Sequence, residues 1–228
     1  MKKLHIPALR RLLPVAFSFC LGLSAFTSCE VINDEPIEAY MMQLDRDSIV
    51  LMLGDTARLN MWFQPDTVTN VSAFWEVIDS TGIINVLQNG SVIATQVGET
   101  DVRVVAANAR LEDTCHVEVI EDWRELYDTY PYDMLVYADV DVQGHHNDAK
   151  GLRIAAFIDG EVRGYGEVRT DRDVTYTLFR IWHYRPRNGT ITFRYYLPYE
   201  LATGELEFEM YFDGDVHGKL NKLISITQ

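Results

Sequence analysis

Short alternating segments separated by tight-turn pairs are the feature that most constrains the fold of this chain. From Tyr40 onward, apolar residues recur at every second position in segments such as TARLNMWF (56–63) and TCHVEVI (114–120). This period places alternate side chains on opposite faces of a β-strand. The pairs that favour tight turns between segments are Asn89-Gly90, Asp159-Gly160 and Asp213-Gly214. Since no long helical pattern is present, the sequence predicts an all-β fold of two antiparallel β-sandwich domains.

Residues 38–121 carry the more specific of two family patterns. The segments are IVLMLGDTARLNM, FWEVIDSTGIINVLQNGSVIATQVGETDVRVVAA and DTCHVEVIE. Together they resemble a bacterial Ig-like domain of group two. The matching positions are Gly54, Trp75, Val86, Gly90, Val92, Ala94, Gly98, Val102, Val104, Cys115, Val117 and Val119. The resemblance implies structural roles for these residues, no common catalytic site, and service as a spacer, stalk or adhesive unit.

Residues 133–228 form a second β-rich segment, which follows a charged, aromatic-bearing linker at 122–132. The segments YPYDMLVYADVDVQG, IAAFIDGEVRGYGEV and ITFRYYL resemble a C-terminal β domain common in Bacteroidota surface proteins. Val162 stands where many relatives have cysteine. This resemblance implies a fold and a location rather than an activity.

The first 28 residues have the layout of a secretory signal. Lys2, Lys3, Arg10 and Arg11 precede an apolar stretch at 12–26, with no acidic residue before Cys29. The stretch is short for a membrane span, and an uncleaved signal anchor is the open alternative.

Cys29 is the predicted lipid attachment site. Thr27 and Ser28 precede it and resemble a bacterial lipobox, with Phe26 in place of the usual leucine. The resemblance implies cleavage before Cys29 and acylation of its thiol, and more than one acyl chain gives lasting membrane anchoring. Residues 29–37 then form an acidic tether. It resembles the signal that sends Bacteroidota lipoproteins to the outer face of the outer membrane; the alternative is an ordinary acidic linker.

Cysteine content and charge narrow the function further. Removal of residues 1–28 takes away Cys20, and acylation uses Cys29, so Cys115 is left without a disulfide partner and is expected to be buried and inert. The whole chain has a formal net charge of -14. Because such a surface repels phosphate backbones, we expect no nucleic-acid partner.

Aromatic residues of the second segment are the candidate ligand-binding residues. Trp182, Tyr184 and Tyr196 are chosen because exposed rings stack on sugar rings while a hydroxyl group hydrogen-bonds. The alternative is a core position, since Tyr176, Leu178, Trp182 and Tyr184 share one face of a predicted strand.

Four triplets that begin with Asp-Ser or Asp-Thr in the first segment resemble the Asp-Ser/Thr-apolar O-glycosylation motif of the Bacteroidota. They place possible glycans on Ser48, Thr56, Thr67 and Ser80. The motif is short, so chance occurrence is the competing explanation.

Other polar clusters favour surface roles over chemistry. Asp139, Asp141, His145, His146 and Asp148 offer metal-ligand atoms, but they are explained as solvent-facing strand and loop residues, and no metal or cofactor is predicted. Glu161 and Arg163 are expected to form a solvated surface pair. The motifs of serine hydrolases, zinc proteases and phosphate-binding loops are missing from the sequence.

The sequence therefore predicts a non-enzymatic lipoprotein of the outer membrane that faces the cell exterior. An Ig-like stalk presents a second β domain to a glycan or protein ligand. The alternative is a structural spacer or assembly component of a surface complex.

Overall fold

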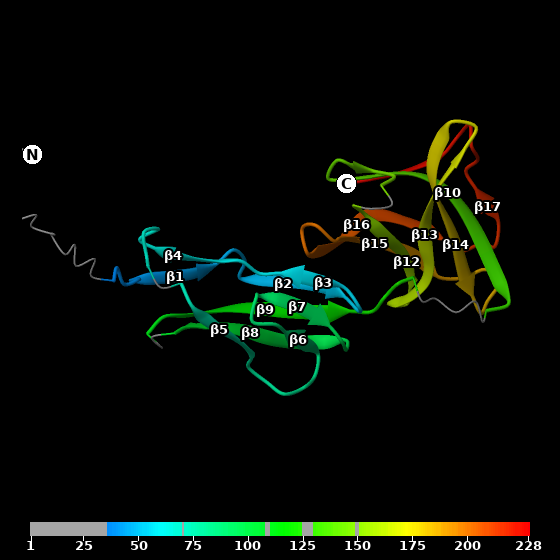
Figure 1. Cartoon of the computed structure of the whole chain (residues 1–228). Helices are drawn as coiled ribbons and strands as arrows, with labels where there is room; N and C mark the ends of the chain where they lie inside the picture. Colours follow the sequence, from blue (N-terminus) through cyan, green and yellow to red (C-terminus); the bar gives the residue numbers. More distant parts are fainter. Residues whose placement is uncertain (1–35, 70, 108–109, 125–129, 149–150) are drawn as a thin grey trace, which may run out of the picture. The chain divides into compact units, whose positions relative to one another are not determined.

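The described part of the chain consists entirely of strands and their connections. The computed structural model describes residues 36–69, 71–107, 110–124, 130–148 and 151–228 (Figure 1). The predicted signal peptide, Cys29 and residues 29–35 of the predicted tether lie outside the described residues. The all-β prediction is confirmed, and within the described ranges no helix is long and apolar enough to cross a membrane.

In the first region, residues 36–121, the described residues form nine strands. They are β1 (Met41–Leu44), β2 (Ser48–Met52), β3 (Thr56–Arg58), β4 (Met61–Gln64), β5 (Ala73–Val77), β6 (Ile84–Val86), β7 (Ser91–Ala94), β8 (Gly98–Ala106) and β9 (Glu112–Ile120). One sheet has the order β2-β9-β8-β5 and another has the order β3-β7-β6, while β1 pairs with β4. The pairs are antiparallel except for β2 with β9.

The alternating residues of the first region form a single core, as the sequence predicts. Cys115 and Val117 of β9 are fully buried, whereas His116 between them is exposed. Trp75 of β5 fills the same core. Its ring packs at Gly90, where an added Cβ atom would lie 2.5 Å from the Leu59 carbonyl oxygen and 3.0 Å from the indole. A residue with a side chain at position 90 would therefore push against both the backbone and the ring.

The predicted strand 56–63 is divided in the structure. Its alternating residues Ala57, Leu59, Met61 and Phe63 face the core or pack against it, but β3 and β4 belong to different sheets. The break falls at Asn60, whose backbone N–H and side-chain amide both donate to the Asp45 carboxylate at 2.9 Å. Alternation alone does not reveal this break, because the inward-facing residues continue through it.

The second region, residues 130–228, contains the remaining strands. They are β10 (Tyr132–Val142), β11 (His145–His146), β12 (Arg153–Ile158), β13 (Glu161–Asp171), β14 (Val174–His183), β15 (Thr190–Leu197), β16 (Ala202–Tyr211), β17 (Val216–His217) and β18 (Ile224–Thr227). Their order is β11-β10-β14-β13-β12-β15-β16, and β17 and β18 each pair in parallel with β10.

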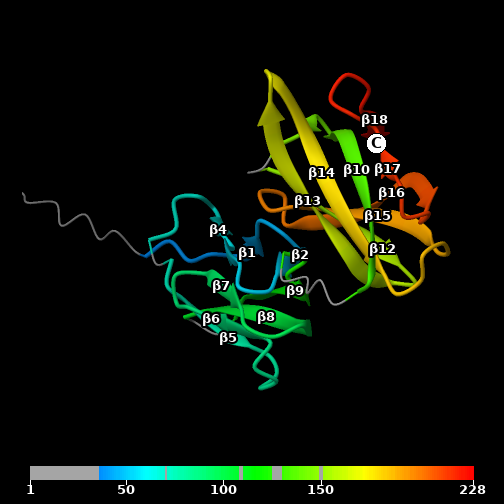
Figure 2. The ribbon, with the colours of Figure 1, turned by 90° about the vertical axis from the view of Figure 1, so that its right-hand side faces the viewer.

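The strand β13 joins the two layers of the second region. Its residues 161–165 pair with β12, and its residues 166–171 pair with β14 (Figures 1 and 2). The core between the layers takes Val136 and Val140 from β10, Phe179 from β14, and Ile191 and Phe193 from β15. The outer face of β10, β13 and β14 therefore does not contribute to this core.

A smaller apolar cluster contains residues from the first region, the second region and the segment between them. Met52, Trp123, Ala155, Phe157 and Tyr196 are all buried in it. Nearby, the Arg153 guanidinium contacts the Asp55 carboxylate at 2.7 Å. These contacts explain why the Tyr196 side chain is withdrawn from solvent.

Candidate functional site

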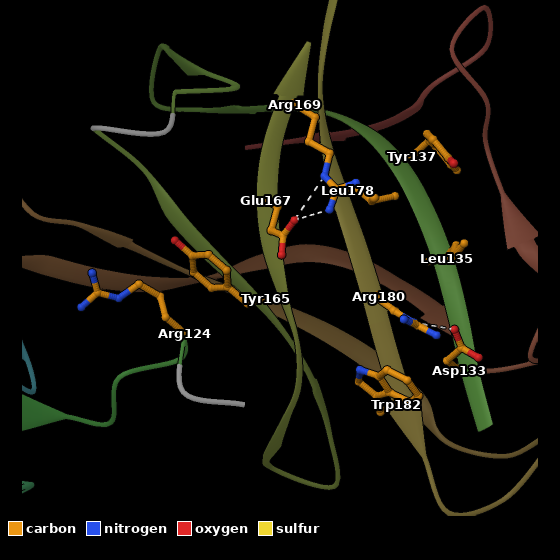
Figure 3. A pocket seen from close by; sticks show the side chains of 10 residues that line it. All are labelled: Arg124, Asp133, Leu135, Tyr137, Tyr165, Glu167, Arg169, Leu178, Arg180 and Trp182. Atoms are coloured by element: carbon orange, nitrogen blue, oxygen red, sulfur yellow. Dashed lines mark hydrogen bonds and ion pairs between the residues drawn. The ribbon is translucent and has the colours of Figure 1, made fainter. Parts of the chain in front are cut away.

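A groove of about 690 Å³ lies on the outer face of β10, β13 and β14 (Figure 3). Its volume lies in the range typical of small-ligand sites. The lining combines aromatic, aliphatic and charged side chains, which are Arg124, Asp133, Leu135, Tyr137, Tyr165, Glu167, Arg169, Leu178, Arg180 and Trp182.

Strand alternation explains why these residues face the groove. On β14, Phe179 and Ile181 point into the core, so Leu178, Arg180 and Trp182 point outward. The register of β10 with β14 sets Asp133 opposite Trp182 and Tyr137 opposite Leu178. Because these strands are hydrogen-bonded neighbours, the groove has a floor of regular sheet rather than of loops.

Arg180 organises the wall of the groove at Trp182. Its Nε donates to an Asp133 carboxylate oxygen at 2.8 Å, and its guanidinium carbon lies 4.2 Å from the centroid of the Trp182 ring. The ion pair and the cation–π contact hold both partners in one arrangement. The remaining guanidinium N–H groups can donate to a bound molecule.

Two further arginines carry their own carboxylate partners. Arg169 of β13 donates to Glu167, and Arg124 donates to Asp122 through Nε and Nη2. Partial burial acts to raise the pKa of Asp122, but the hydrogen bonds and charge of Arg124 lower that pKa overall. Burial raises the pKa of Tyr165, so its hydroxyl group stays protonated near neutral pH and can act as a donor.

The aromatic residues chosen from the sequence have three different environments. Trp182 lines the groove, while Tyr184 is 45% exposed outside the groove lining and lies against Arg185. Tyr196 is 0% exposed, so the prediction that its ring meets a ligand is wrong for this structure. Burial raises the pKa of Tyr196 to about 12.

Sequence reasoning missed Tyr137 and Tyr165. The signal for Tyr137 was present, because it alternates with the inward-facing valines of β10. Tyr165 gives a weaker signal, since it lies between two glycines in the strand that joins the two layers. The expected core face of β14 is in fact the groove face, although Tyr176 at its far end is buried.

Arg163 also differs from its expected position. It is only 5% exposed, so its pair with Glu161 is not a solvated surface pair. Its guanidinium carbon lies 4.3 Å from the centroid of the Tyr130 ring. The pairing of β12 with β13 is irregular between Ala156 and Phe157, where the register shifts. Past this irregularity, residues of β13 that simple alternation places outside face inward.

The remaining predicted positions are the possible O-glycosylation sites, Cys115 and the candidate metal ligands. The possible O-glycosylation sites Ser48, Thr56, Thr67 and Ser80 are all exposed, and their modification stays a prediction. Cys115 is confirmed as buried, and burial raises its pKa to about 12, which disfavours the reactive thiolate. Across the described ranges, groups of three or more His, Cys, Asp or Glu placed to hold a metal ion are not found.

Comparison with known proteins finds solved structures of low similarity to this chain. No family model and no curated protein matches the chain. Domains 5–6 of the S-layer protein SbsC are 11% identical over 81% of this chain and 100% of that chain, with a TM-score of 0.32. Domains 4–9 of SbsC are 11% identical over 84% of this chain but only 32% of that chain, with a TM-score of 0.31.

Human protocadherin-24 EC1-2 is 8% identical over 84% of this chain and 100% of that chain, with a TM-score of 0.29. At similarity this low, the function has to be argued from the groove itself.

Proposed function

We propose that this chain is a lipid-anchored surface protein that binds a glycan in the groove of its second region, without catalysis. The observation that carries the proposal is the Asp133–Arg180–Trp182 arrangement on the groove wall. The face of an aromatic ring packs against the apolar face of a sugar, and fixed polar groups beside it hydrogen-bond the sugar hydroxyls.

The charged groups of the groove suit binding better than acid–base chemistry. Each of its carboxylates, Asp133 and Glu167, is engaged by an arginine, Arg180 and Arg169 respectively. Charge-assisted hydrogen bonds from an arginine hold a carboxylate in one position. This arrangement supports a rigid recognition surface.

The binding proposal is tested with a glycan array and the full chain purified in mild detergent. We expect Trp182→Ala to lose binding to the glycans that the native chain retains. Tyr199→Ala is the matched control, because Tyr199 is highly exposed and lies outside the groove lining. Equal retention by native chain and Trp182→Ala on every glycan would rule out this groove as the site.

The anchoring proposal rests on the sequence around Cys29 and is tested separately. Protease treatment of intact cells should remove the native protein, and Cys29→Ala should be released from membranes. Protection of the native protein from protease would place it in the periplasm and would contradict a surface function.

Assembly into a surface complex is the second candidate function. Trp62 and Val71 of the first region are 47% and 56% exposed, and both line one shallow apolar pocket. Exposed apolar residues that cluster in this way are typical of protein contacts. Analytical ultracentrifugation of native chain and Trp62→Glu would decide: a complex that Trp62→Glu dissociates supports assembly, and a native monomer contradicts self-assembly through this surface.

A further inference from the structure

We propose that the groove binds an extended acidic polysaccharide, and that Arg172 and Lys219 form a second cationic subsite beyond Tyr137. This inference rests on the proposed glycan-binding function and specifies its ligand class. The shared chemistry of the ligand is a chain of sugars that carries carboxylate or sulfate groups.

The groove continues past its main pocket. A second pocket of about 550 Å³ lies beyond Tyr137, and Tyr137 lines both pockets. In the second pocket Tyr137 stacks on Tyr176, with ring centroids 5.5 Å apart and an interplanar angle of 29°. The two pockets therefore share an aromatic boundary, which suits a ligand of several linked rings rather than one.

The two pocket linings differ in charge from the chain as a whole. The chain as a whole has 34 acidic and 20 basic residues. The linings of the two pockets reverse this ratio, with five cationic residues against the three carboxylates of Asp133, Glu167 and Asp171. Even when Asp122 beside Arg124 is counted, cations are in excess here. A local excess of cations in so acidic a chain favours an anionic ligand.

The two cationic side chains of the second pocket face solvent. Arg172 and Lys219 are both exposed. Within the described ranges, neither side chain lies within 4.0 Å of a carboxylate oxygen. Their donors are therefore available to a ligand. Arginine and lysine bind carboxylate and sulfate groups through charge-assisted hydrogen bonds.

The backbone at Arg172 offers a clean way to test this subsite. Arg172 and Asp173 form the two-residue turn between β13 and β14, with φ angles of 48° and 64°. Turns of this kind prefer asparagine and glycine, because other residues are strained in the left-handed region. Arg172→Asn therefore removes the charge while it keeps or improves the stability of the turn.

The experiment is native affinity electrophoresis of the full chain in detergent. The gels contain polygalacturonate, which is carboxylated, dextran sulfate, which is sulfated, or neutral dextran. We expect one or both acidic polymers to retard the native chain more than dextran does. The double variant Arg172→Asn/Lys219→Asn should weaken this binding roughly tenfold or more, because two charge-assisted contacts are lost.

Arg187→Asn is the matched control, since Arg187 is an exposed arginine of the same region that lies outside both pocket linings. Retardation by polygalacturonate alone would identify carboxylates as the recognised group, and retardation by dextran sulfate alone would identify sulfates.

Two results would overturn the inference: no preference for either acidic polymer, or equal weakening by Arg187→Asn and by the double variant. The proposed function would survive both results if Trp182→Ala still abolished binding to a neutral glycan. It would fail only if Trp182→Ala changed no glycan interaction, so the two failures are distinguishable.

Discussion

The two regions of this chain place tryptophan on opposite faces of their strands. Trp75 of β5 points into the core of the first region, whereas Trp182 of β14 points out into the groove of the second. The difference lies in the neighbours of each residue. The inner face of β14 is already filled by Phe179 and Ile181, so an outward tryptophan there leaves no gap in the core. In an alternating strand, a large aromatic residue does not by itself indicate a core where the opposite face already supplies large apolar core residues.

The largest expected effect on stability comes from truncating Trp75, and truncation of Trp182 is the comparison. Trp75→Ala should lower the free energy of unfolding by about 3–5 kcal/mol, because it leaves a cavity in a close-packed core. Trp182→Ala should lower it by about 1 kcal/mol or less and should act on binding instead. Urea denaturation followed by circular dichroism measures both. Equal destabilisation by the two variants would remove the contrast between the regions.

A second contrast compares two glycines that have nearly the same backbone conformation. Gly90 has a φ angle of 82° and Gly160 has a φ angle of 80°. An added Cβ atom at Gly90 meets the Leu59 carbonyl and the Trp75 ring, but at Gly160 nothing lies within 4 Å. Gly90→Ala should cost about 2–4 kcal/mol, from conformational strain plus overpacking, and Gly160→Ala should cost strain alone. Thermal unfolding checks this order, and a larger loss for Gly160→Ala would contradict it.

The next comparison concerns β5, the edge strand of one sheet in the first region. Gln88 accepts from the Trp75 backbone N–H at 3.1 Å and donates to its carbonyl at 2.8 Å, as a neighbouring strand would. Gln88→Ala should therefore cost about 1–3 kcal/mol and expose this edge to pairing with other chains.

Gln96→Ala is the control for this prediction, because Gln96 is exposed. Thermal unfolding and light scattering are the measurements. Identical behaviour of Gln88→Ala and Gln96→Ala would show that the side-chain bonds do not protect the edge.

The smallest effect concerns histidine and pH. Burial and the nearby Arg163 lower the pKa of His183 from 6.5. The unfolded chain then binds a proton at a higher pH than the folded chain does. As the pH falls below about 6.5, the contribution of His183 to stability should decrease.

The measurement for His183 is the change in Tm between pH 7.5 and pH 5.5. His183→Asn should reduce this change. An unaltered pH dependence in His183→Asn would assign the effect to other groups.

Alternation was sufficient to predict the strand content and much of the core. Cys115 and Val117 face inward because their strand has one clearly polar face and one clearly apolar face. β14 has large apolar residues on both faces, so its pattern cannot decide which of them is buried. The position of Tyr196 depends on contacts with Met52 and Trp123, which are distant in sequence. The groove was therefore only partly predictable, since its lining combines three strands and Arg124.

The regular sheet beneath the groove has a consequence for the kinetics of binding. Most of the lining side chains are attached to β10, β13 and β14, whose backbones are already fixed by hydrogen bonds. A ligand that settles on such a floor has little of the protein left to order, so its entropic cost falls mainly on the ligand itself. Association should then follow a single exponential phase, and ligands of different affinity should differ chiefly in how fast they leave.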